Sequence, residues 1–186
     1  PLRRQRQMCI RDRRKHMEEQ IEHLSQNDAL TGFYNRDFFL NLCDELINKA
    51  RMNHQALSMI KIDLDCFKNI TDGYGHEVGD QAILKAAHAL EVISKDLGYI
   101  GRLSCDQFML VLDGVKGVDA FRIAKLAQEK ITAQKIRLDE NTTTCLTSKA
   151  GVTELRESDE NSRHLFNRVQ EAIVAIKRSR ENAKIA

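Results

Sequence analysis

Apolar side chains recur with two different periods along the chain, and the order of these periods predicts a mixed fold. Around residues 56–64 they alternate, with Ile60, Ile62 and Leu64 pointing one way, which is typical of a half-buried strand. Further strand patterns cover 103–112, as a hairpin, and 142–153. Helical spacing is found at residues 35–52, 78–93, 118–131 and 162–179. This order predicts an α+β domain with a mostly antiparallel sheet.

The predicted hairpin has an unusual turn. It lies in the stretch GRLSCDQFMLVLD, residues 101–113, and its link is Ser104, Cys105, Asp106 and Gln107. A tight hairpin favours glycine or asparagine at positions of positive φ. The sequence therefore predicts that Asp106 is held at the tip for a ligand, and that side chains at 104 and 105 strain the turn.

Two further carboxylates end the predicted strand 56–64. Asp63 and Asp65 have the same parity, so an extended chain places both on one side. If this strand neighbours the hairpin, Asp63 and Asp106 face a common ligand, and Mg²⁺ prefers such oxygens. The alternative is that these acids cap helices and solvate a loop. The spacings of a calcium loop and of a phosphate-binding glycine loop are both absent.

The composition excludes few classes of protein, but the cysteines indicate a cellular compartment. The 186 residues are 42% hydrophobic and carry a formal net charge of +2, so they can form a core and do not require nucleic acid or membrane as partner. The five cysteines form no C-x-x-C pair, which favours a reducing, cytoplasmic location over a disulfide or zinc framework. No apolar run is long enough to cross a bilayer, and a membrane or sensor module upstream stays open.

Residues 1–24 differ from the rest of the chain. Their first part is arginine-rich and contains RQMCIRDR, which resembles translated adapter sequence and indicates that this part is not native; a basic tail that binds nucleic acid is the alternative. A heptad-like seam predicts a helical stalk, either a dimerising coiled coil or a helix folded back on the domain. The seam consists of Ile10, Arg14, Met17, Ile21 and Leu24.

Four segments together resemble the GGDEF family, the diguanylate cyclases that join two GTP molecules into cyclic di-GMP. DALTGFYNR (28–36) is similar to D-x-L-T-G-L-x-N-R, and DLDCFKNITDGYGHEVGD (63–80) to D-x-D-x-F-K-x-x-N-D-x-x-G-H-x-x-G-D. RLSCDQF (102–108) stands in place of R-Y-G-G-[DE]-E-F, and AIVAIKRSREN (172–182) resembles A-L-Y-x-A-K-x-x-G-R-N. The resemblance identifies residues 25–186 as a GGDEF-like domain with the degenerate signature SCDQF.

The resemblance implies a nucleotide-cyclase-like (ferredoxin-like) central sheet surrounded by helices, and it assigns roles by position. It implies magnesium as cofactor, GTP as ligand, and a homodimer or fusion to an upstream sensor domain. The metal ligands would be Asp63, the Leu64 carbonyl and Asp106, and vestigial catalytic roles would fall to Asp106 and Lys68. Around the nucleotide would lie Thr71, His76, Asp80 on the guanine, and Lys177, which with Lys68 would face the phosphates.

The departures from the family pattern concern the same site. Thr71 replaces an asparagine that reads guanine, and a hydroxyl cannot offer the paired donor and acceptor of an amide. Gln107 replaces an acid, Lys149 a serine, and Glu181 an arginine near the phosphates. The inhibitory product-binding motif R-x-x-D falls at KDLG, residues 95–98, where Lys95 and Gly98 supply neither partner, so no inhibitory site is expected.

Three hypotheses follow from the sequence. The preferred one is a catalytically silent GGDEF domain that serves as a dimerisation, relay or GTP-sensing module. The second is a weakly active diguanylate cyclase, since Asp63, Asp106, Lys68, Asp80 and Lys177 are all present. The third is an unrelated binding protein with a similar pattern.

Overall fold

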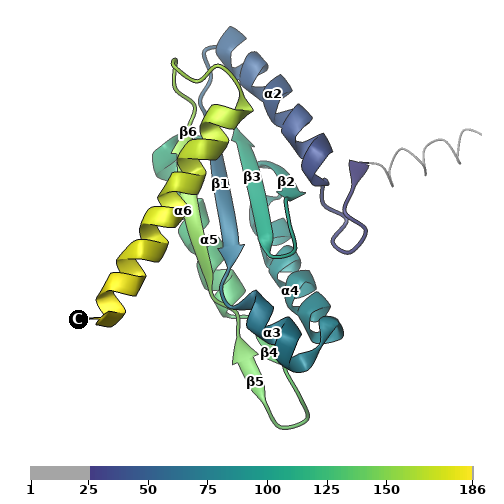
Figure 1. Cartoon of the computed structure of the whole chain (residues 1–186). Helices are drawn as coiled ribbons and strands as arrows, with labels where there is room; N and C mark the ends of the chain where they lie inside the picture. Colours follow the sequence, from purple (N-terminus) through teal and green to yellow (C-terminus); the bar gives the residue numbers. More distant parts are fainter. Residues whose placement is uncertain (1–25, 186) are drawn as a thin grey trace, which may run out of the picture.

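A four-stranded antiparallel sheet with helices on both faces forms the domain in the computed structural model, which describes residues 26–185, with side chains to residue 176 (Figure 1). The predicted stalk and the other features of residues 1–24 lie outside the described residues. The helices are α2 (Arg36–Met52), α3 (Phe67–Tyr74), α4 (His76–Ser94), α5 (Gly117–Thr132) and α6 (Ser162–Ile185). The strands are β1 (Leu57–Leu64), β2 (Gly98–Arg102), β3 (Gln107–Asp113), β4 (Lys135–Arg137), β5 (Thr143–Cys145) and β6 (Ser148–Glu154).

The sheet order is β2-β3-β1-β6, and every neighbouring pair in it is antiparallel. β1 and β3 occupy the centre, and all eight residues of β1 are buried. Two β-α-β crossovers joined by the β2-β3 hairpin produce this order, which is the ferredoxin-like arrangement. The predicted α+β class with a mostly antiparallel sheet is confirmed.

The alternation of side chains along the strands divides the core in two. Ile60, Ile62 and Leu64 pack with α4 and α5 on one face, as predicted from their parity. Met59 and the other odd-numbered apolar position of β1 face α2 and α6. The α2 helix begins directly after Asn35, whose side-chain oxygen accepts a hydrogen bond from the Phe38 backbone N–H.

The pattern missed the short elements at one end of the sheet. The helix α3 contains no fully buried residue, and although Phe67 and Ile70 pack against the core, its eight residues are too few for helical spacing to be recognised in the sequence. The predicted strand 142–153 is in fact two strands in different sheets, β5 paired with the unpredicted β4 and β6 paired with β1. The first hairpin strand ends at Arg102, so Leu103 belongs to the turn and not to a strand.

Candidate functional site

The hairpin turn lies beside the end of β1. The Leu64 backbone N–H donates to the Asp106 carbonyl at 3.0 Å, so the predicted neighbourhood of these two segments is confirmed. Ser104 and Cys105 are exposed. In the described part of the chain the non-glycine residues with positive φ are His54, Cys66 and Asp96, so the prediction that the turn is strained at 104 and 105 is wrong.

The Arg102 side chain fixes this turn through its backbone carbonyls. Its Nε donates to the Ser104 carbonyl at 3.2 Å and its Nη2 to the Cys105 carbonyl at 2.9 Å. Its Nη1 contacts both carboxylate oxygens of Asp28, at 3.0 and 3.2 Å. One guanidinium therefore joins the turn to the segment that precedes α2.

Asp28 is itself held firmly. Its Oδ1 accepts hydrogen bonds from both the backbone N–H and the hydroxyl of Thr31. Partial burial alone would raise the pKa of Asp28, but the hydrogen bonds from Thr31 and Arg102 outweigh it and hold the pKa below its ordinary value. Asp28 is thus charged at neutral pH, as the contact with Arg102 requires.

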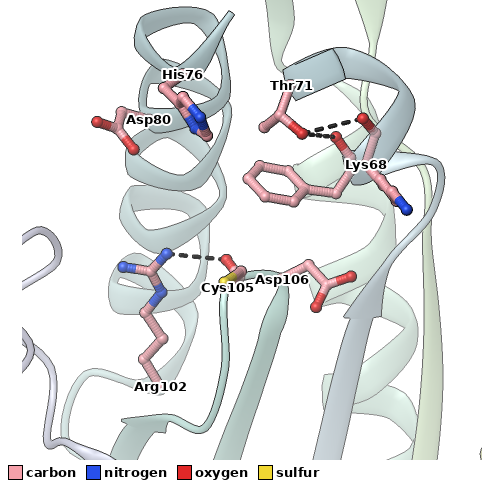
Figure 2. Close-up of a pocket in the computed structure, with 8 residues that line it drawn as sticks. Lys68, Thr71, His76, Asp80, Arg102, Cys105 and Asp106 are labelled. Carbon is pink, nitrogen blue, oxygen red and sulfur yellow. Dashed lines mark hydrogen bonds between the residues drawn. The ribbon is translucent and has the colours of Figure 1, made fainter.

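A pocket of about 330 Å³ opens between the turn, α3 and α4 (Figure 2). Four of the residues predicted to bind nucleotide or catalyse line it, together with Asp106 from the turn. These four are Lys68, Thr71, His76 and Asp80. Sequence reasoning missed Phe67, Arg102 and Cys105 as lining residues, although RLSCDQF and the D-x-D-x-F-K match contain them. Figure 2 shows the Asp106 side chain pointing away from Arg102.

Thr71 is turned into its own helix rather than toward a ligand. Its hydroxyl donates to the Lys68 carbonyl at 3.0 Å and lies 3.5 Å from the Phe67 carbonyl (Figure 2). Its methyl group packs against α4, where a Cβ added at Gly79 would lie 2.5 Å from it. The position offers the pocket no amide and no free O–H donor.

The acids at the end of β1 lie close to a lysine. In the sheet register Asp63 stands opposite Gln107 on β3 and opposite Lys149 on β6. The Lys149 ammonium forms an ion pair with Asp65, which also accepts a hydrogen bond from the Thr147 hydroxyl at 3.0 Å. Asp63 is 5% exposed. Asp63 does not line the pocket that contains Asp106.

The remaining predicted positions are placed only in part. Lys177 and Glu181 lie on α6, but their side chains are outside the described residues. At the predicted inhibitory motif, Gly98 begins β2, and a Cβ there would collide with the Val111 carbonyl. An aspartate at position 98 therefore requires a different backbone path.

Comparison with known proteins gives this geometry a family. The GGDEF profile, described as "Diguanylate cyclase, GGDEF domain", matches residues 25–183. The chain is 28% identical to a diguanylate cyclase of Vibrio cholerae over 89% of its length, and 30% identical to diguanylate cyclase DgcM of Escherichia coli over 92%. It spans 51% and 41% of the lengths of these two relatives.

A solved structure agrees with the assignment. The crystal structure of diguanylate cyclase SiaD in complex with its activator SiaC, from Pseudomonas aeruginosa, superposes with a TM-score of 0.79 at 27% identity. The match covers 96% of this chain and 70% of that one. The fold and site define a nucleotide-cyclase-like domain. The chain belongs to the GGDEF family of cyclic di-GMP signalling. Within the described residues, no helix is both long and apolar enough to cross a membrane.

Proposed function

We propose that this GGDEF domain is catalytically silent and serves as a dimerisation, relay or GTP-sensing module in cyclic di-GMP signalling. GGDEF domains bind GTP and often dimerise. The observation that carries the proposal is the state of Thr71. Its hydroxyl is bonded back to α3, and its methyl faces Gly79, so Thr71 offers no amide to the guanine edge and leaves Asp80 without that second contact to the base.

The loss matters because cyclisation demands accurate placement of two nucleotides. In the family each protomer presents one GTP, and each 3′-hydroxyl attacks the α-phosphate of the other, so a loosely held base misplaces the reacting atoms. Gln107 removes a charge beside Asp63, and Glu181 reverses one near the phosphates. If each of these substitutions raises the activation free energy by about 1.4 kcal/mol, each one lowers the rate about tenfold.

The contacts of Arg102 support a relay. The backbone of Tyr34 forms two hydrogen bonds with β2. Its carbonyl accepts one from the Arg102 backbone N–H at 2.8 Å, and its N–H donates the other to the Ile100 carbonyl at 3.1 Å. Arg102 then connects Asp28 to the turn that bears Asp106. A displacement of residues 26–35 therefore reaches the pocket through hydrogen bonds and not through a flexible loop.

The experiment that tests the proposal is incubation of the purified chain with GTP and Mg²⁺, followed by chromatographic analysis of the products. We expect no cyclic di-GMP above the level of an Asp106→Ala variant. Calorimetry with GTP, repeated on Lys68→Ala, measures binding separately from turnover. Robust synthesis that disappears in Asp106→Ala overturns the proposal and establishes an active cyclase.

A weakly active diguanylate cyclase is the second candidate, because the pocket does bring Lys68, His76, Asp80 and Asp106 together. The combined variant Thr71→Asn, Gln107→Glu, Lys149→Ser and Glu181→Arg, with glycines at 104 and 105, distinguishes the two. Under the silent hypothesis, activity emerges only in this combined variant. Under the alternative, the unaltered chain already has activity that the combined variant increases.

A further inference from the structure

The carboxylates at the end of β1 have a cation of their own. Lys149 is directly opposite Asp63 in the antiparallel β1-β6 register, and its ammonium is paired with Asp65. The side chains of Lys149 and Asp65 are only 17% and 11% exposed. Three charged groups are thus gathered where water is largely excluded.

The surroundings of Asp63 fix this arrangement. Lys61, two residues earlier on the same face, donates to Gln170 of α6 at 2.5 Å. Gly151 on β6, opposite Lys61, faces Val169 and Ile173 of the same helix. The helix α6 therefore covers this face of β1 and β6, as it does in Figure 1.

The donor set does not fit the divalent cation that the family resemblance implies. The cross-strand neighbours of Asp63 are Gln107 and Lys149, and neither is an acid. Asp106 lines the pocket on the α3-α4 side, where its carboxylate accepts a hydrogen bond from the Ser104 hydroxyl at 3.3 Å. A cation bound by Asp63 also meets the positive charge of Lys149.

We propose that the Lys149 ammonium takes the place of the divalent cation at Asp63 and Asp65, so that the domain binds no Mg²⁺ there and holds any GTP without metal. This inference deepens the proposed silent function and rests on it, because a lysine gives the acids a permanent countercharge but lacks the double charge and the open coordination positions with which Mg²⁺ polarises phosphate oxygens. Replacement of a serine by lysine then has a structural purpose. It neutralises buried acids that no longer bind metal.

The test uses Mn²⁺ as a spectroscopic substitute for Mg²⁺. Electron paramagnetic resonance of free Mn²⁺, together with thermal unfolding in millimolar Mg²⁺, should show no binding and no shift for the unaltered chain. Lys149→Ser should bind Mn²⁺ at least about tenfold more tightly and gain a Mg²⁺-dependent rise in melting temperature. Lys135→Ser, a change of an exposed lysine on the strand β4, is the matched control and should behave like the unaltered chain.

Lys149→Met, which keeps the apolar stem and removes the charge, replaces the serine variant if that one does not fold. The inference is overturned if the unaltered chain binds Mn²⁺ and Asp63→Asn abolishes the binding, or if folded Lys149 variants bind no better than the unaltered chain. Product analysis separates the two proposals. Cyclic di-GMP formation contradicts the silent function, whereas metal binding without product contradicts only the inference.

Discussion

Two neighbouring parts of the β2-β3 hairpin differ in how tightly the rest of the domain holds them. The hairpin root, which here means Gly101 and Arg102 at the end of β2 next to the turn, has Gly101 buried against Phe39 of α2 and Arg102 bonded to Tyr34 and Asp28. The hairpin tip, residues 104–106, contacts the domain mainly through its own backbone carbonyls. The tip has lost both glycines of the family signature, whereas the root has kept its arginine.

This difference separates two uses of glycine. A glycine needed for a left-handed turn conformation could not be replaced without strain, yet neither Ser104 nor Cys105 has a positive φ. Arg102 fixes the turn instead. Its planar guanidinium binds two carbonyls and a carboxylate at the same time, which the single point charge of a lysine ammonium cannot do. The turn of this chain therefore folds without the two glycines of the family signature.

The largest effect is expected at the root. Arg102→Ala removes an ion pair whose arginine is 12% exposed, and it leaves two carbonyls without this donor and Asp28 without its countercharge. We expect the free energy of unfolding to fall by about 2–4 kcal/mol, measured by urea denaturation. Arg122→Ala, which breaks an exposed pair with Asp119, should cost about 0.5 kcal/mol or less. Equal costs would show that the root does not hold the hairpin.

The wall of the pocket offers the next largest effect. Gly79→Ala places a Cβ 2.5 Å from the Thr71 methyl, and we expect a loss of about 1–3 kcal/mol. Thr71→Ser removes that methyl and should restore most of the loss in the double variant. Gly73→Ala on α3 meets nothing within 4 Å and should stabilise the domain by about 0.5–1 kcal/mol. If Gly79→Ala is as benign as Gly73→Ala, α3 and α4 are not in close contact.

The length of each element explains which parts of the fold could be predicted from the sequence. Long periodic segments such as 35–52 and 56–64 were predicted to within a residue or two, because each buries a whole apolar face. The short helix α3 and the β4-β5 ribbon were missed, since elements of eight and three residues are too short for a period to be recognised in the sequence. Tertiary position, not local periodicity, defines them.

The site was predicted unevenly for a similar reason. The motifs brought Lys68, Thr71, His76, Asp80 and Asp106 to one pocket from two separate stretches of chain, 63–80 and 102–108. Motif spacing cannot show which group pairs with which, so the bond from Arg102 to Asp28 and the pairing of Lys149 with Asp65 went unforeseen. The substituted lysine was noticed only as a departure; its partner became visible in the sheet register.

At the tip we expect a smaller effect with an informative sign. Ser104→Gly with Cys105→Gly should lower the free energy of unfolding by about 1 kcal/mol, because glycine increases the freedom of the unfolded chain and relieves no strain here. The double alanine variant should stay within about 0.5 kcal/mol of the unaltered chain. The glycine pair alone should not produce cyclic di-GMP from GTP. A stabilising glycine pair would mean that the tip is strained after all.

The smallest effect is on the pH dependence of the stability, and it again concerns the root. The pKa of Asp28 is held below its ordinary value, so its ion pair with Arg102 contributes stability that is fully present above the unfolded pKa of about 3.9. As pH falls through the lower folded pKa, the carboxylate takes up a proton and that contribution is lost. Urea denaturation between pH 6 and about pH 3 should therefore show a steeper acid loss for the unaltered chain than for Asp28→Asn, which has no proton to gain at this position. Because Asp28 is partly exposed, the difference should be smaller than the cost of any root substitution. Parallel curves for the two proteins would show that Asp28 does not titrate with unfolding, and that Arg102 holds the turn through its two carbonyl bonds alone.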